Sequence, residues 1–286
     1  MKKIMSAFLI LIFAIAFCVV GSSCEKKEYP IKVMSFNIRC IAFEPELNNM
    51  WVNRKDRVLQ LIKDYDPDII GFQELKEGQY VFLKENLEGY GYYGEHRGPF
   101  ILTSEAAAIF WKKDRFEALE KETFWLSETP NQMSKGWDAD LERICTRVTF
   151  KDKLSKQTFS HFNTHLDHKG TVARTEGLKL ILNRIEESAL PTILTGDFNF
   201  SEGTDRYQLI LDQNLVDTKY QSPQENSDSG GTYNGFGTPN SDKPIDFIFT
   251  TKDFEAHSHK IIRDSDEEGN YPSDHFPIIS EVVLKK

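Results

Sequence analysis

Hydrophobic and polar positions along this chain follow two different periods. In residues 31–39 (IKVMSFNIR) they alternate, which is typical of a β-strand, and the polar Asn37 falls near the C-terminal end of that strand. Residues 54–65 place apolar side chains at i, i+3, i+4 and i+7, so we expect an amphipathic helix that ends at the following DPD sequence. The apolar segment 68–74 (DIIGFQE) then predicts a buried strand that ends in Glu74.

Strand-like and helix-like segments continue to the C-terminus. Residues 172–188 carry one apolar helical face, and residues 225–243, rich in Ser, Gly and Asn, are predicted to form a loop at a site. Further strands are expected near 105–111, 144–150, 157–165, 191–199, 245–250, 256–262 and 277–284. Helices interleaved with many strands indicate a single α/β domain, a four-layer α/β sandwich with two mixed β-sheets flanked by helices.

The N-terminal sequence MKKIMSAFLILIFAIAFCVVGSSC has two lysines, a short apolar run and small residues before Cys24. This pattern predicts a bacterial lipoprotein signal with Cys24 as the lipidated first residue of the mature chain. An ordinary cleaved signal or an uncleaved anchor is the alternative, and each also exports the protein. We therefore expect a lipid-anchored protein of the bacterial cell envelope, periplasmic or surface-exposed, divided as follows: signal peptide 1–23, short tether 24–30 and folded domain 31–286.

Charge and cysteine content narrow the function classes. The formal net charge is −9, and removal of two signal-peptide lysines leaves 33 basic against 44 acidic residues, a charge of −11. This balance argues against tight, sequence-independent binding to long nucleic acid. The folded part keeps Cys40 and Cys145, which form either one disulfide or two buried thiols, and no CxxC or Cys/His cluster suggests structural zinc.

Two histidines and an aspartate lie where a strand gives way to a glycine turn, in FNTHLDHKG (162–170). Strand alternation predicts His165 and Asp167 on one face and His168 on the other. Taken alone, a histidine here is better explained by packing in the core or at the sheet edge.

Polar residues of the same kind follow several other apolar segments. A carboxylate at the end of a buried strand is costly unless it is paired or binds a cation. Singly, Glu74 could cap a helix, Asp197 could begin an Asx-turn and Asp274 could be an N-cap. Together they indicate a metal-centred site, and the oxygen-rich set suits Mg²⁺ or Mn²⁺. The strand-end set is Asn37, Glu74, His165, Asp197, Asn199, Asp246, Asp274 and His275.

Six short motifs, in this order along the chain, resemble those of the endonuclease/exonuclease/phosphatase superfamily: SFNIR, DIIGFQE, NTHL, GDFN, IDFIF and SDHFPI. The likeness spans residues 31–284. Within that superfamily, Trp51 and the segment NTHLDHKGTVAR look most like the bacterial branch related to carbon catabolite repressor-type 3'-5' exonucleases.

The resemblance implies a role for each matching position. Asn37 and Glu74 would hold Mg²⁺, with Asp274 near the same ion, and Mn²⁺ is expected to substitute. Asp197, with Asn199 beside it, would orient and deprotonate the attacking water. His275, polarised by Asp246, and His165 would hold the phosphoryl oxygens as charge develops on them.

Substrate contacts are less well specified by the sequence. Candidates for substrate phosphate contacts are Arg54, Arg97, His168 and Arg174, with solvated surface charge as the alternative reading. Tyr233 and Phe236 could stack on a base or sugar, or simply pack in their loop.

We therefore predict a phosphoesterase (EC 3.1) that cuts phosphodiesters or phosphomonoesters, with 3'-5' exonuclease activity as one form. The expected substrate is nucleic acid, a nucleotide or a phospholipid headgroup, and no protein partner is expected. Alternatives are a phospholipid or inositol-phosphate hydrolase and a non-catalytic binding lipoprotein.

Overall fold

The computed structural model describes residues 27–223, 227–239 and 241–285. The predicted signal peptide and Cys24 lie outside these residues, and so does the first part of the predicted tether. Among the helices of the described part, none is both long and apolar enough to cross a membrane.

The first sheet has six strands in the order β11-β12-β1-β2-β4-β3. β1 and β2 are parallel, whereas every other neighbouring pair is antiparallel, so the sheet is mixed. Its strands are β1 (Ile31–Asn37), β2 (Ile69–Gln73), β3 (Tyr90–Tyr93), β4 (Ile109–Lys112), β11 (Phe254–Ile261) and β12 (Ile278–Leu284).

The second sheet repeats this plan with the order β5-β6-β7-β8-β10-β9. Here β7 and β8 are the parallel pair at the centre. Its strands are β5 (Phe116–Trp125), β6 (Ile144–Asp152), β7 (Thr158–His165), β8 (Thr192–Asp197), β9 (Leu215–Asp217) and β10 (Asp246–Thr251).

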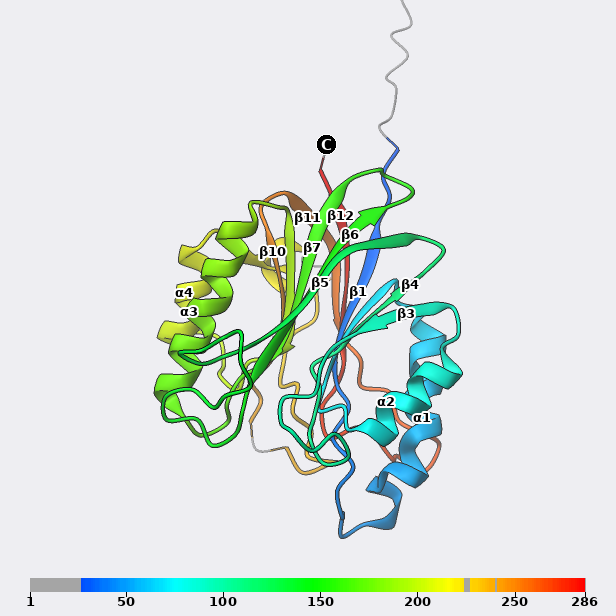
Figure 1. Ribbon diagram of the computed structural model, residues 1–286. Coiled ribbons are helices and arrows are strands. Elements are labelled where there is room, and N and C mark those ends of the chain that lie inside the picture. Colours follow the sequence, from blue (N-terminus) through cyan, green and yellow to red (C-terminus); the bar gives the residue numbers. More distant parts are fainter. Residues whose placement is uncertain (1–26, 224–226, 240, 286) are drawn as a thin grey trace, which may run out of the picture.

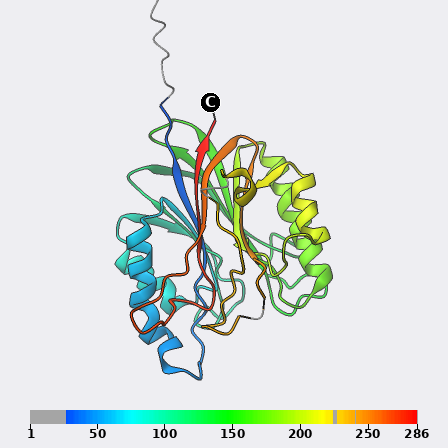
Figure 2. The same cartoon turned by 180° about the vertical axis from the view of Figure 1, so that it is seen from behind.

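Helices cover the outer faces of both sheets, as Figures 1 and 2 show from opposite sides. α1 (Trp51–Tyr65) and α2 (Glu77–Asn86) lie on the first sheet, and α3 (Thr171–Ser188) and α4 (Asp205–Asp212) lie on the second. Separate hydrophobic clusters fill the two helix–sheet layers and the space between the sheets. This confirms the predicted four-layer α/β sandwich. The short helices are η1 (Leu47–Asn49) and α5 (Thr218–Gln221).

The interior between the sheets changes from apolar to polar toward one end. Asn163 of β7, fully buried, donates from Nδ2 to the Phe72 carbonyl at 2.8 Å and accepts from Gln73 Nε2 at 2.7 Å. Thr195 of β8 donates to the same Asn163 Oδ1 at 3.0 Å. Gly71 faces these side chains, and its missing Cβ lets the sheets approach closely. We call this group, Gly71, Gln73, Asn163 and Thr195, the polar seam.

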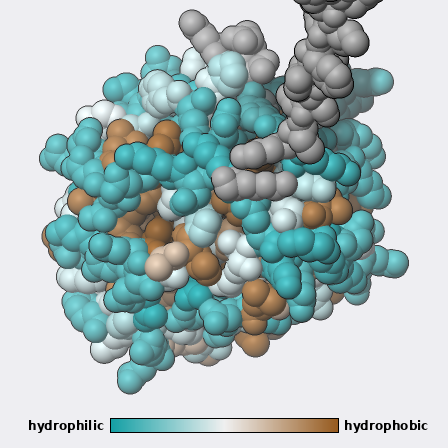
Figure 3. All heavy atoms as spheres, turned by 90° about the horizontal axis from the view of Figure 1, so that it is seen from above, coloured by the Kyte–Doolittle hydropathy of each residue, from teal (hydrophilic) through white to brown (hydrophobic). Residues whose placement is uncertain are grey.

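The termini of the described chain lie at the opposite end of the sandwich from the C-terminal end of β1 (Figure 1). Figure 3 looks down on the end that holds the termini and shows a mostly hydrophilic surface with hydrophobic side chains in separate small groups.

Most predicted elements are present, with shifted ends. The strand expected over 105–111 begins only at Ile109, because Ala106 instead forms isolated bridges to Leu75 and His96. The helix expected over 54–65 begins three residues earlier, at Trp51.

Candidate active site

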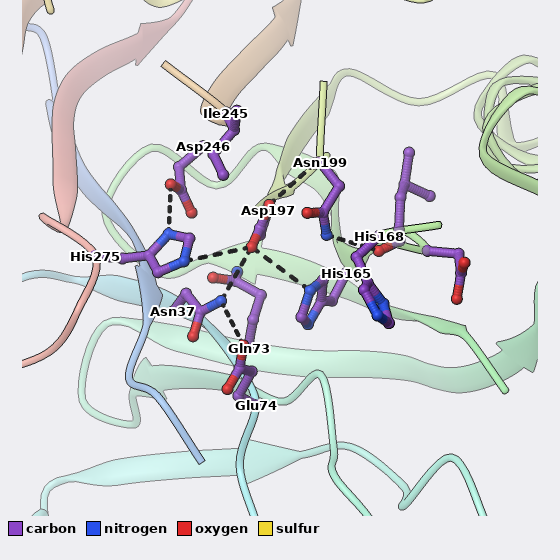
Figure 4. Close-up of polar contacts among 12 residues, drawn as sticks. Asn37, Gln73, Glu74, His165, His168, Asp197, Asn199, Ile245, Asp246 and His275 are labelled. Atoms are coloured by element: carbon purple, nitrogen blue, oxygen red, sulfur yellow. Dashed lines mark hydrogen bonds and ion pairs between the residues drawn. The ribbon is translucent and has the colours of Figure 1, made fainter. Parts of the chain in front are cut away.

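Strand direction brings the predicted site residues to one end of both sheets. β7 and β8 are parallel and β10 is antiparallel to β8, so His165, Asp197 and Asp246 lie side by side across the second sheet. In the first sheet, Asn37 ends β1 and Glu74 directly follows β2. These residues meet across the end of the sandwich (Figure 4). The pocket there has a volume of about 400 Å³ and is lined by Arg39, Cys40, Glu74, Arg97, Glu105, Leu141, Arg143, His165, His168, Asp197, Asn199, Tyr233, Ile245, Asp274 and His275.

His275 and Asp246 form a buried imidazole–carboxylate pair. His275 Nδ1 lies 2.9 Å from Asp246 Oδ2, and both residues are less than one-tenth exposed. Burial opposes the charge on His275, but Asp246 outweighs it and holds the pKa of the imidazole well above its usual value. The ring therefore carries a positive charge at neutral pH, with Nε2 directed at Asp197 Oδ2, 3.8 Å away.

Asp197 lies at the centre of the site. Its Oδ2 accepts from Asn37 Nδ2 at 3.0 Å and lies 3.5 Å from His165 Nε2, while Oδ1 accepts from the Asn199 backbone at 3.0 Å. Burial, and then the charge of Asp246, raise the pKa of Asp197 to about 7, although His275 opposes this. A carboxyl group with a pKa near neutrality is suited to accept a proton from water.

Carboxylates dominate the side of the pocket formed by the first sheet. Glu74 Oε1 accepts from Asn37 Nδ2 at 3.1 Å, and Oε2 accepts from the Cys40 backbone at 2.9 Å. Burial would raise the pKa of Glu74, but the Cys40 N–H and the His275 charge lower it. Burial and the charge of Glu74 raise the pKa of Asp274 even though His275 opposes this, so the two carboxylates lie close enough to repel each other.

This donor set fits a hard divalent cation. Glu74 and Asp274 supply carboxylate oxygens, and the Asn37 amide lies beside Glu74 with its Oδ1 accepting from the Arg39 backbone at 3.0 Å. Arg39 Nε lies 3.7 Å from Asp274 Oδ2. A cation there would relieve the repulsion between the carboxylates. A second grouping, Asp197, Asp246 and His275, also brings its ligand atoms within 4.8 Å of one another, but the hydrogen bond between Asp246 and His275 already uses His275 Nδ1.

Basic side chains also line the pocket: Arg97, Arg143 and His168, which we call the basic wall. Arg143 Nη2 lies 3.0 Å from His168 Nδ1, and Arg97 Nη2 pairs with Glu105 Oε1 at 3.0 Å. Burial, and then the charges of Arg143 and Arg97, lower the pKa of His165 well below its usual value, so its ring is neutral.

The structure corrects the predicted side-chain directions in 162–170. β7 ends at His165, so alternation does not extend past it. Asp167 lies away from the pocket, where its carboxylate accepts backbone N–H groups of Asp140, Leu141, Lys169 and Gly170. His168 lines the pocket together with His165 instead of facing the other way.

Two predicted phosphate contacts are not at the pocket. Arg54 is fully buried, and its guanidinium donates to the backbone carbonyls of Ile38, Arg39, Asn49 and Pro272, so it has no free group for a substrate. Arg174 donates to the Asp167 carbonyl at 2.7 Å and supports the turn beneath the basic wall.

Loop 227–239 contributes Tyr233 to the pocket. Its ring packs edge-on against His275, with centroids 5.2 Å apart. Phe236 lies over the Arg54 guanidinium instead, which supports its packing role.

Comparisons with known proteins agree on one family. The sequence model of the Endonuclease/Exonuclease/phosphatase family matches residues 34–275. A solved structure of a family protein from Bacteroides thetaiotaomicron is 34% identical and covers 91% of this chain and 100% of that chain, with a TM-score of 0.83. The structure of a mannosyl-6-phosphatase from Bacteroides thetaiotaomicron VPI-5482 is 35% identical and covers 89% of this chain and 100% of that chain, with a TM-score of 0.82.

Eukaryotic proteins are similar over the same domain. The CCR4-Not complex 3'-5'-exoribonuclease subunit Ccr4 of Aspergillus oryzae is 23% identical over 93% of this chain and 48% of its own length. This chain therefore spans about half of that relative.

Proposed function

This chain belongs to the endonuclease/exonuclease/phosphatase family, and on that premise we propose that it hydrolyses phosphate esters with the help of a bound divalent metal ion. The observation that carries the proposal is the continuous set of contacts from Asp246 through His275 and Asp197 to Asn37 and Glu74. A purely binding protein has no use for a buried carboxyl group poised as a base beside a charged imidazole.

Each group has a defined task in this proposal. Asp197 accepts the proton of the attacking water, and Asn199 holds the loop after β8 through its bond to the Leu166 carbonyl at 3.0 Å. The charged His275 and the neutral His165 donate to phosphoryl oxygens as negative charge grows on them. A Mg²⁺ or Mn²⁺ ion held by Glu74, Asn37 and Asp274 would supply Lewis-acid stabilisation of that charge.

The similarity to a mannosyl-6-phosphatase makes phosphorylated sugars the first substrates to test. The exonuclease form of the hypothesis is supported by the Ccr4 relative at lower identity, and the formal charge of −9 argues against tight binding to long RNA. A hexose 6-phosphate and a short single-stranded RNA therefore belong in the same first assay.

The metal hypothesis is tested with Glu74→Gln, which removes a charge and little volume. Chelation should abolish hydrolysis and Mg²⁺ or Mn²⁺ should restore it, while Glu74→Gln should weaken Mn²⁺ binding in calorimetry and slow turnover. Glu117→Gln, at an exposed position of β5, is the matched control. Equal Mn²⁺ affinity in the wild type and Glu74→Gln would remove this residue from the metal site.

We also propose that the protein is exported and anchored by lipid on Cys24, as the N-terminal sequence predicts. Stable anchoring needs more than one acyl chain, which a bacterial lipoprotein carries. The wild type should partition into the detergent phase and Cys24→Ala into the aqueous phase, with Cys40→Ala as control. A wild type found wholly in the aqueous phase contradicts this proposal.

A further inference from the structure

We propose that Arg143, with Arg97 and His168, forms a phosphate-binding wall that makes this enzyme prefer terminal phosphate groups, which carry two negative charges, over phosphodiesters. The inference rests on the proposed phosphoesterase function and specifies the class of ester that it accepts.

The first support is an unused donor on Arg143. The residue is only 4% exposed, and its Nη1 makes no hydrogen bond with any part of the chain that the structure describes. A buried guanidinium N–H without an acceptor is costly, so such a group at a pocket indicates a ligand that would satisfy it. Arg143 lines the same pocket as Glu74, Asp197 and His275.

The second support is the way in which Arg143 is held. Its Nε donates to Asp167 Oδ2 at 3.3 Å, and its Nη2 lies 3.0 Å from His168 Nδ1. Asp167 is itself fixed by backbone N–H groups, including that of Gly170 at 2.7 Å. The guanidinium is therefore oriented before any substrate arrives, and its Nη1 has no partner among the described residues.

The third support is the shape of the space beyond the wall. A cavity of about 10 Å³ adjoins it, lined by Glu74, Arg97, Glu105, Ala106, Ala107, Arg143, Ile144 and His165. Such a volume holds about one water molecule and no further part of a substrate. A phosphoryl group placed between Glu74 and the basic wall thus has no room to extend a second substituent into this cavity.

Neighbouring acids offset the charge of the basic wall in the absence of a substrate. Glu105 pairs with Arg97, Asp167 with Arg143, and Asp140 lies 3.6 Å from His168 Nε2. These pairs keep the empty wall close to neutral, which lets it persist in a buried position. A dianionic phosphate then supplies two negative charges and an acceptor for the Nη1 group of Arg143. A diester carries one negative charge fewer and an additional substituent.

The test compares two esters that differ by one methyl group, p-nitrophenyl phosphate and methyl p-nitrophenyl phosphate, at saturating Mg²⁺. The wild type should favour the monoester. Arg143→Gln should lower kcat/KM for the monoester by about ten- to a hundredfold and should change the diester value much less, because a charged hydrogen bond is lost. Arg147→Gln is the matched control, since Arg147 lies four residues further on, within β6, and pairs with the exposed Glu120.

Binding of inorganic phosphate, measured by calorimetry with Mg²⁺ present, gives a readout independent of turnover. Arg143→Gln should weaken it and Arg147→Gln should not. The inference is overturned if the wild type prefers the diester. It is also overturned if Arg143→Gln lowers kcat/KM equally for both esters and binds phosphate as tightly as the wild type. If Arg143→Gln does not fold, Arg97→Gln decides in the same way. A wild type inactive on all phosphate esters instead refutes the proposed function, and phosphate binding still tests the wall.

Discussion

Asp197 Oδ2 is approached by side chains from three separate segments. Asn37 donates to it at 3.0 Å, and the ring nitrogens of His165 and His275 lie 3.5 and 3.8 Å away. In a buried site, such charges influence one another more strongly than they would in water. Protonation of Asp197 therefore depends on the state of its neighbours, and the group acts as a unit.

This coupling leads to a prediction for His275 and Asp246. His275→Ala should lower turnover by about a hundredfold to a thousandfold, because a charged donor to the phosphoryl oxygens is lost. Asp246→Asn should cost less, since the imidazole remains but is more easily neutral. The double variant should be scarcely slower than His275→Ala alone. Turnover in a double-mutant cycle with p-nitrophenyl phosphate checks this, and additive losses would show that the two residues act independently.

The site residues that end apolar strands could be predicted from the sequence. The sequence did not show which arginines lie at the pocket. Arg143 and Arg147 lie four residues apart in the same RICTRV segment, and both face charged neighbours. Only the fold places Arg143 at the pocket and Arg147 beside Glu120 on the outer surface. The burial of Arg54 could not be predicted from its place in an amphipathic helix, because the carbonyls that bind its guanidinium come from segments as distant as Pro272.

At the scale of elements, β1 was predictable from its alternating pattern and β2 from its apolar run. β5 was missed, since its sequence FEALEKETFW is largely polar and most of its middle faces solvent at the edge of the sheet. The polar seam was also missed. Asn163, Gln73 and Thr195 meet only after two sheets pack, and strand alternation does not reveal which residues face each other across them.

Gly71 tests how closely the sheets must approach at the polar seam. A Cβ at this position would lie 2.3 Å from Thr195 Oγ1 and 2.5 Å from Asn163 Oδ1, and both partners are held by buried hydrogen bonds. Gly71→Ala should therefore lower the free energy of unfolding by roughly 1–3 kcal/mol. It should also reduce turnover, because Glu74 directly follows the strand that contains Gly71.

Urea unfolding and turnover of Gly71→Ala measure these effects. Gly89→Ala is the matched control, since a Cβ at Gly89 has no other atom within 4 Å among the described residues. If Gly71→Ala has the same free energy of unfolding and the same turnover as Gly89→Ala, the sheets can separate at the polar seam without cost.

At the scale of the whole molecule, buried histidines away from the pocket connect stability to pH. His259 belongs to β11 of the first sheet and contacts α5, with Nδ1 at 3.0 Å from Thr218 Oγ1. Burial, with Lys219 nearby, lowers its pKa to about 4. Burial lowers the pKa of His161 to about 3. Both folded pKa values lie below the ordinary value of 6.5, so at acid pH the unfolded chain binds more protons than the folded chain. Each histidine therefore lowers the free energy of unfolding as the pH falls below 6.5.

The prediction concerns the difference between two proteins, because buried acids act in the opposite sense. Burial raises the pKa of Asp217 to about 6, for example, so its protonation favours the folded state. His259→Gln should remove up to about 1.4 kcal/mol per pH unit from the slope of unfolding free energy between pH 6.5 and 4. Urea unfolding at several pH values measures the slope, with His257→Gln as control. Parallel slopes for the wild type and His259→Gln would contradict the assignment.

The layout of the two ends of the sandwich has a practical consequence. The described chain begins just before β1, and the pocket lies where β1 finishes, seven residues and about 20 Å further on. The C-terminal strand returns to the starting end. A bead, a sensor chip or a fluorescent carrier joined at either end of the described chain therefore leaves the pocket mouth directed toward the bulk solution, where small phosphorylated molecules arrive by diffusion.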